Sequence, residues 1–327
     1  MTTWFLRRLA SAMLLVLLLV TAVFFVVRLA PGDPLDQVAT EEMSQAEREL
    51  IRGRLGLDRP LAEQYVDWLT GVLRGDFGRS LRQHRPVGEV VGEALPATLL
   101  LTVTSYILHL ALALAAALAM VLRAGRPVAR GIHGAGLVLY SMPAFWLGLM
   151  LIMVFSRSLG WFPAGGMAGA DARYLGFGAR LLDLAHHLVL PMLTLALGSF
   201  MATARYLRSA LADVMNQDHI LAARARGLPE RTVILRHGLR NALMPGITLA
   251  GLSLPFLLGG AVVVEVVFGW PGMGRVTLEA VWARDYPVIM ATTVVAAVTV
   301  VAGSLMADVL DMWADPRVRL AGREERS

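Results

Sequence analysis

The segment NQDHILAARARGLPERTVILRHGLRNALMP, from Asn216 to Pro245, contains two short helix signals and many arginines. The first signal is a helix from Asp218 to Arg226, with Asp218 as its N-terminal cap. Gly227 follows at the position where helices commonly end in a left-handed backbone conformation, which glycine adopts without steric cost. The pattern therefore predicts a short helix with a defined beginning and end.

A second helix signal follows directly. Pro229 is suited to the start of a helix, and Glu230 lies in the first turn, where a carboxylate interacts favourably with the helix dipole. Two ordered helices between hydrophobic segments indicate a contact surface rather than a simple connection. The alternative is an ordinary basic loop on the inner side of a membrane.

The hydrophobic content on both sides of this segment indicates a membrane protein. The chain has 327 residues, 56% of them hydrophobic, and a mean hydropathy of +0.60, which is more apolar than soluble proteins usually are. We expect an all-α polytopic protein with six transmembrane helices. The six spans are Leu9 to Val27, Ala97 to Leu122, Ala135 to Phe155, Leu188 to Ala204, Leu243 to Val264 and Val288 to Val309.

The arginines predict the orientation, because positive residues in short loops stay on the cytoplasmic side. The presumed inner segments contain Arg7, Arg8, Arg123, Arg126, Arg130, seven arginines from Arg205 to Arg240, Arg317, Arg319, Arg323 and Arg326. Both termini are therefore expected in the cytoplasm, and the protein in a bacterial plasma (inner) membrane. A cleaved signal peptide is the alternative for the first span, but Arg28 lies where a cleavage site needs small residues.

Two residue types are missing, and each excludes a class of chemistry. Without cysteine there are no disulfides, thiolate nucleophiles or cysteine-based zinc sites. Without lysine there is no standard phosphate-binding loop for ATP, since that motif requires a lysine. We expect no cofactor and no metal. The net charge of +5 suits anionic lipid head groups, and no nucleic-acid-binding module is recognisable.

The chain divides into three predicted regions. Residues 1–96 comprise the first span and a long external loop, residues 97–312 a five-helix core with the cytoplasmic loop 205–244, and residues 313–327 a cytoplasmic tail. The external loop contains two helix candidates, Ser44 to Leu55 and Leu61 to Leu73. Its size suits docking of a partner or gating, although a loop that only shields the outer mouth is equally consistent.

A few polar residues and prolines inside the spans are candidates for a gate or pathway. Glu265 lies near the outer end of the fifth span, and Ser253 and Pro255 precede it. Charge within a span indicates function by default, and proline permits a kink, although structural roles are as common. His109 in the second span is interpreted as a buried hydrogen-bonding residue rather than a proton relay.

Several segments of the sequence together resemble a known family. Asp218 to Gly227 followed by RHGLRNALMP (Arg236 to Pro245) is similar to the cytoplasmic signature loop of permease subunits in binding-protein-dependent ABC importers. The segments LLGGAVVVEVVFGWPGMGR (Leu257 to Arg275), RDYPV (Arg284 to Val288) and the closing DPR (Asp315 to Arg317) resemble the dipeptide, oligopeptide and nickel branch. The similarity extends from Leu6 to Arg319, with matching order and spacing.

The resemblance implies the type I importer permease fold, with a Glu-Ala-Ala-x-x-x-Gly loop that forms a coupling helix in a groove of a cytoplasmic ATPase. On this chain the four signature positions are Leu221, Ala222, Ala223 and Gly227. Leucine replaces the signature glutamate, which puts an ion pair at that position in doubt. We expect both alanines to allow close approach to the ATPase. We expect the flanking arginines to bind its acidic or carbonyl groups; this ATPase-coupling site comprises Asp218, Leu221, Ala222, Ala223, Arg224, Arg226, Gly227 and Pro245.

The partners that the resemblance implies are a second permease subunit, two cytoplasmic ATPase domains and an external solute-binding protein, in addition to membrane lipid. The chain itself is then a non-catalytic transport subunit that forms half of a translocation pathway. We expect a di- or oligopeptide as substrate, with nickel complexes or glutathione-like peptides as alternatives. No cluster in the spans has metal-ligand spacing, so the residues do not favour a bare metal ion.

An intramembrane serine hydrolase is the alternative from another class. Ser199, Ser253 and Ser304 lack the Gly-x-Ser-x-Gly setting, and the sequence places no histidine clearly beside any of them. A channel or passive scaffold is a further alternative. Neither explains a paired-helix loop suited to a cytoplasmic partner.

Overall fold

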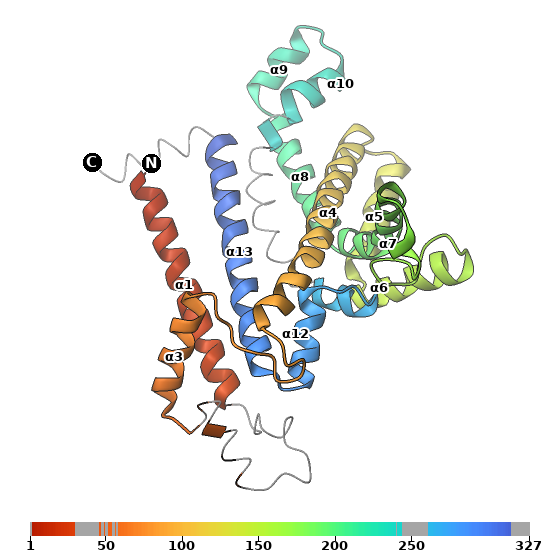
Figure 1. The fold of residues 1–327 in the computed structure, drawn as a ribbon. Coiled ribbons are helices and arrows are strands. Elements are labelled where there is room, and N and C mark those ends of the chain that lie inside the picture. The colour runs from red at the N-terminus through yellow and green to blue at the C-terminus, as the bar shows by residue number, and fades with distance from the viewer. Residues whose placement is uncertain are drawn as a thin grey trace. The chain divides into compact units, whose positions relative to one another are not determined.

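The computed structural model describes residues 2–29, 46, 49, 52–53, 56, 58–239, 241–243 and 261–314. Within these ranges the regular structure is helical, apart from one isolated bridge between Arg79 and Pro86 (Figure 1). The chain divides into two compact units. One unit contains Met1–Arg7, Leu99–Trp270 and Ala302–Ser327, and the other contains Arg8–Thr98 and Pro271–Val301.

Four of the described helices are long and apolar enough to cross a membrane. They are Leu6–Leu29 within α1 (Thr2–Leu29), α4 (Val87–Leu122), α7 (Phe177–Leu197) and Tyr286–Met306 within α13 (Tyr286–Ala314). A fifth candidate is a bent pair, in which Pro127–Ser141 and Ala144–Ser158 meet at 109°. The predicted span Leu243 to Val264 lies mostly outside the described residues.

Three predicted spans have different boundaries in the structure. The helix predicted to start at Ala97 begins at Val87, so the predicted region boundary at residue 96 falls inside α4. The span Ala135 to Phe155 is interrupted at Met142 and Pro143, because the residue before a proline is driven out of the helical conformation. The span Leu188 to Ala204 is interrupted after Leu197. The sequence periodicity was strong enough to find these helices but not their ends.

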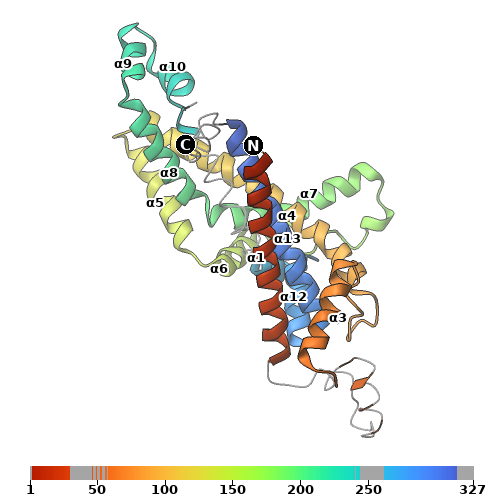
Figure 2. The ribbon, with the colours of Figure 1, turned by 90° about the vertical axis from the view of Figure 1, so that its left-hand side faces the viewer.

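In the unit formed by Arg8–Thr98 and Pro271–Val301, α3 (Leu61–Leu73) packs against α1, as Figure 2 also shows. This confirms the helix predicted from Leu61 to Leu73, whereas the helix predicted from Ser44 to Leu55 lies largely outside the described residues. Phe24 is fully buried against the rings of Tyr65 and Trp68. The long loop is therefore anchored to the first helix by an aromatic cluster.

The same unit contains a buried polar contact at the turn of residues 283–285, which joins α12 (Met273–Trp282) to α13 and is called the Asp285 turn below. Asp285 and Ser80 are each 2% exposed. The Ser80 hydroxyl donates to Asp285 Oδ2 at 2.5 Å, and the Arg82 N–H donates to the same oxygen at 3.2 Å. Arg284 has a left-handed backbone, with φ of 48°. The turn is thus stabilised by residues more than two hundred positions earlier in the chain.

The other unit contains α5 (Pro127–Ser141), α6 (Ala144–Leu151), a π-helical segment (Ile152–Ser158), a 3-10 turn (Ala172–Tyr174), α7 and α8 (Phe200–Met215). A Cβ atom built on Gly136 of α5 would lie only 1.8 Å from the Met201 Cε atom of α8. Glycine at this position therefore allows the two helices to approach closely, as small residues do in membrane proteins.

Candidate functional site

The two predicted helices between the hydrophobic segments are present, and residues 216–238 are called the two-helix loop below. α9 (Asp218–Ala225) follows α8, and α10 (Glu230–Thr232) continues into a π-helical turn (Val233–Gly238). Figure 1 shows α9 and α10 beyond the end of α8, on the far side from α6 and α7 of the same unit. The loop is therefore presented as a projecting surface.

The start of α9 differs from the prediction by one residue. Gln217 is the N-cap, with an extended backbone, and Asp218 is the first residue of the helix. No side chain caps this end of the helix. The Asp218 carboxylate lies in the first turn, where it interacts favourably with the helix dipole without a specific hydrogen bond.

Gly227 ends this helix region with a left-handed backbone, as predicted. Its φ is +73°, and a Cβ atom at this position would meet no heavy atom within 4 Å. The glycine is therefore required by backbone conformation and not by lack of space. The left-handed conformation of Gly227 sets the direction in which the chain enters α10. A β-branched residue rarely adopts positive φ, so it would change this direction.

The underside of the two-helix loop has its own apolar core. Ile220 and Ala223 of α9 are buried against Val233 and Ile234 of the following turn. The cluster also contains Leu211, Val214 and Met215 of α8 and Ala242, and Leu118 and Val121 of α4 pack against it. Ala223 was expected to face a partner, but its side chain points inward. Its small size permits close packing within the loop itself.

An ion pair spans the two short helices. Arg224 Nη2 donates to Glu230 Oε1 at 2.6 Å, and Arg224 Nε donates to Oε2 at 3.1 Å. This two-pronged hydrogen bond holds the pKa of Glu230 below its ordinary value and raises the pKa of Arg224. The prediction that Arg224 binds groups of a partner is therefore revised, since its guanidinium already binds a carboxylate of the same loop.

Leu221 and Ala222 of α9 and the C-cap residue Arg226 are exposed. The Leu221 side chain is 54% exposed, although leucine is usually buried. Arg226 is also exposed, and its Nε donates to the Ala222 carbonyl oxygen at 3.3 Å. The position of the signature glutamate therefore presents an apolar side chain to whatever covers this face.

The predicted gate residues are only partly covered by the structure. Ser253 and Pro255, and also Pro245 of the predicted coupling site, lie outside the described residues. Glu265 lies in a helix of residues 261–267 and is buried, so it is not a solvated residue at an interface. The following turn is tightly packed, since the Gly166 N–H donates to the Phe268 carbonyl oxygen at 2.7 Å.

The break between α7 and α8 is stabilised by a buried histidine. His109 is 2% exposed, with Nδ1 2.8 Å from Ser199 Oγ and Nε2 3.0 Å from Thr203 Oγ1. The expectation of a buried hydrogen-bonding histidine is confirmed. The expectation that no histidine lies beside Ser199 is wrong, because residues separated by 90 positions meet here. The Ser199 hydroxyl donates to the Leu195 carbonyl oxygen. The second imidazole nitrogen of His109 faces the Thr203 hydroxyl, whereas a serine hydrolase triad has a carboxylate at that place.

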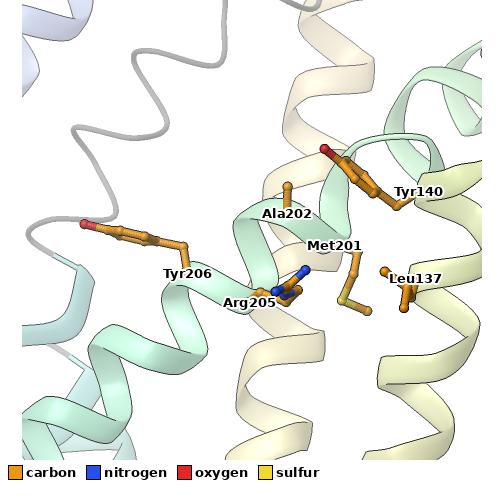
Figure 3. Close-up of a pocket in the computed structure, with 6 residues that line it drawn as sticks. All are labelled: Leu137, Tyr140, Met201, Ala202, Arg205 and Tyr206. Carbon is orange, nitrogen blue, oxygen red and sulfur yellow. The ribbon is translucent and has the colours of Figure 1, made fainter.

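A cavity of about 370 Å³ lies between α5 and α8. Its lining residues, drawn in Figure 3, are Leu137, Tyr140, Met201, Ala202, Arg205 and Tyr206. Tyr140 reaches from α5 toward α8, while Tyr206 extends from α8 in another direction (Figure 3). In the sequence Arg205 was interpreted only as the charged end of a span. The available signal in the sequence was Arg205 itself, one helical turn before Arg208, and it gave no indication of a cavity.

Among the described residues, no group of three or more histidines, cysteines, aspartates or glutamates is arranged to hold a metal ion.

Comparisons with known proteins agree with this architecture. The model of the binding-protein-dependent transport system inner membrane component matches residues 110–320, and its N-terminal companion matches residues 1–102. The oligopeptide transport system permease protein AppB of Bacillus subtilis (strain 168) is 42% identical over 322 residues, covering 97% of this chain and 99% of AppB. The glutathione transport system permease protein GsiC of Salmonella choleraesuis (strain SC-B67) is 38% identical over 319 residues, covering 98% and 99%.

The fold also matches a solved structure. A chain of the inward-facing MetNI methionine ABC transporter has a TM-score of 0.55 and 18% sequence identity, and the match covers 69% of this chain and 96% of that chain. The structural match supports the fold, and the family models and sequence relatives extend over nearly the whole length. This chain therefore belongs to the family of inner membrane components of binding-protein-dependent transport systems, the permeases of ABC importers.

Proposed function

We propose that this chain forms half of the translocation pathway of a di- or oligopeptide importer and receives its driving force through the two-helix loop. The observation that carries the proposal is the form of this loop. It projects beyond α8, it has an apolar core shared with α8, and it presents Leu221 on its exposed face. A force applied to such a compact element is transmitted to α8 rather than absorbed by local unfolding.

The proposed partners follow from what the chain lacks. Its sequence contains no lysine for a phosphate-binding loop, so ATP hydrolysis is assigned to two separate cytoplasmic ATPase domains. A second permease subunit completes the pathway, and an external solute-binding protein delivers the substrate. The relatives named as permease proteins of transport systems support this role, and the chain itself is proposed to be non-catalytic.

The proposed location is the bacterial plasma membrane, with both termini in the cytoplasm. The arginine distribution supports this orientation, since the two-helix loop and the segment between α4 and α5 are both rich in arginine. The long segment between α1 and α4 then lies outside, where it is available to the solute-binding protein. Protease cleavage within this segment only from the cytoplasmic side would contradict the orientation.

A peptide is the first choice of substrate because AppB, at 42% identity, is named for oligopeptides. Glutathione is the second candidate, because GsiC is 38% identical over an almost equal length. Glutathione is itself a small peptide, so the two candidates differ in size and charge rather than in chemical class.

The test is purification and reconstitution of the complete complex. The tagged permease should bring an ATPase with it, and proteoliposomes containing the complex and its binding protein should accumulate labelled oligopeptides only with internal ATP. Faster uptake of glutathione than of any peptide would favour the second candidate. Isolation of the chain without an ATPase, or uptake independent of ATP, would contradict the proposal.

A further inference from the structure

The cavity between α5 and α8 contains a cation to which the described residues supply no counter-ion. Within the described ranges, Arg224 and Arg275 each bind a carboxylate, whereas no such ion pair involves Arg205. Arg205 is exposed and lines the cavity together with the Tyr140 ring and the apolar side chains of Leu137 and Met201. Figure 3 shows the Arg205 side chain on the flank of α8 that also carries Met201. The site therefore offers positive charge, a phenol and apolar surface in one space.

The position of the cavity along α5 argues against a lipid head group as its occupant. α5 begins at Pro127, directly after the arginine-containing segment of residues 123–126, and Tyr140 lies thirteen residues farther along the helix. At about 1.5 Å per residue this is roughly 20 Å, well inside a hydrocarbon layer of about 30 Å. Arg205 borders the same cavity from α8, and a cation beside apolar side chains is stabilised by water or by an anion.

The chemistry of the lining residues specifies the anion. Guanidinium binds a carboxylate through two parallel hydrogen bonds, and a tyrosine hydroxyl can donate a third. Leu137, Met201 and Ala202 provide contact for an apolar side chain beside that carboxylate. A volume of about 370 Å³ is in the range of small-molecule sites. We propose that Arg205, with Tyr140, binds the C-terminal carboxylate of a peptide as it passes through this chain. This assignment rests on the proposed function and names a site for its substrate.

The experiment uses the complete transporter in proteoliposomes, with saturating binding protein and two versions of one tripeptide. One version has a free C-terminal carboxylate, and the other has a C-terminal amide. The wild type should import the free acid about tenfold faster than the amide, the effect of one charge-assisted contact. Arg205→Gln should reduce import of the free acid to the rate of the amide, whereas Arg205→Lys should retain much of the difference.

Two further variants separate this effect from general damage. Arg208→Gln removes a cation one turn away on the same helix, outside the lining of the cavity, and should leave the ratio of the two rates unchanged. Tyr140→Phe should reduce the ratio by a smaller factor, and it tests the site even if Arg205→Gln does not assemble. Co-purification of the ATPase with each variant reports assembly.

The possible outcomes distinguish the site from the function. If the wild type imports peptides but Arg205→Gln and Tyr140→Phe leave the ratio unchanged, the site assignment is wrong and the proposed function stands. If the effect of Arg205→Gln appears only in vesicles with anionic phospholipid and is equal for both peptides, the cavity binds a lipid phosphate and the assignment is again wrong. If the wild type imports neither peptide, the proposed function fails and the assignment with it.

Discussion

The two-helix loop and the Asp285 turn are both short connections between helices, but they are stabilised in opposite ways. The loop has an ion pair between near neighbours, since Arg224 and Glu230 are six residues apart, and an apolar core that it shares with α8 and with Leu118 and Val121 of α4. The Asp285 turn uses a buried carboxylate whose partners, Ser80 and Arg82, lie more than two hundred residues earlier. The first combines a local ion pair with an apolar core shared with two long helices, and the second depends on a buried polar contact with a distant part of the chain.

Both regions have buried contacts, but the ion pair of the loop is exposed, whereas the polar contact of the Asp285 turn is buried. Breaking the Asp285 contacts leaves polar groups without partners in a buried site, which costs about 1–3 kcal/mol for each group. The exposed pair of the two-helix loop is worth much less, because water and salt screen it. Substitutions in the two regions should therefore affect different quantities, coupling in the first and stability in the second.

The largest expected effect is on coupling, from Gly227→Val. A β-branched residue at φ of +73° is strained by about 1–3 kcal/mol, and relief of this strain redirects the chain at the entry to α10. Transport-coupled ATPase activity should fall at least about tenfold, the factor that corresponds to roughly 1.4 kcal/mol, while membrane insertion remains normal. Gly227→Asn is the matched control, because asparagine tolerates the left-handed region and should retain coupling. Unchanged substrate-stimulated ATPase activity in the valine variant would contradict the role of this turn.

The second effect is on stability, from Asp285→Ala. Removal of the carboxylate leaves the Ser80 hydroxyl and the Arg82 N–H without their acceptor, so we expect a loss of about 2 kcal/mol. Thermal unfolding of the purified complex in detergent measures this loss. Asp67→Ala removes a solvent-exposed ion pair with Arg59 and should change stability by less than about 1 kcal/mol. Equal effects of the two substitutions would remove the distinction between the two regions.

The third effect concerns the exposed leucine of α9. If Leu221 is buried on docking, Leu221→Ala should weaken ATPase binding by about 1–2 kcal/mol, or roughly tenfold in Kd. Because the proposed contact is apolar, the contribution of Leu221 to the affinity for the ATPase should depend little on salt concentration. A double-mutant cycle with the facing ATPase residue, repeated at two salt concentrations, measures both properties. A coupling energy that disappears at high salt would indicate an ionic contact instead.

The smallest effect is the pH dependence of the Arg224–Glu230 pair. The folded-state pKa of Glu230 lies below its ordinary value of 4.5, so the stabilisation is complete above that value and is lost as the pH falls through the lowered folded-state pKa. Because Glu230 is 55% exposed, the pair contributes only about 0.5 kcal/mol after screening by solvent. In the wild type, loss of the pair at low pH should appear as increased proteolysis of the loop. Glu230→Gln should abolish this pH dependence and should leave stability at neutral pH nearly unchanged. An identical pH profile for the variant would contradict the assignment.

Local signals in the sequence were sufficient for the two-helix loop. A glycine after a helix, a proline before the next and a glutamate in its first turn act through neighbouring residues, so their meaning does not depend on the rest of the fold. The helix predicted from Leu61 to Leu73 is present with the same bounds, and Pro60 is its N-cap.

Contacts between distant residues could not be predicted in this way. The sequence shows Ser80 and Asp285 as ordinary polar residues in loops, and it gives no sign that His109 meets Ser199. The direction of a side chain was also inaccessible, and the sequence did not indicate that Ala223 is buried within the loop. Each of these errors concerns which residues face each other in three dimensions, and hydropathy and spacing do not encode that information.

The contact between Gly136 and Met201 has a mechanical consequence. An unbranched thioether changes rotamer at small energetic cost and adapts to irregular surfaces, and opposite it α5 offers a bare backbone without a side chain to interlock. When α8 tilts, the methionine can therefore slide over the glycine and maintain contact throughout the movement. This contact between α5 and α8 lies next to the arginine that we assign to the passing peptide, so a tilt of α8 would move both together.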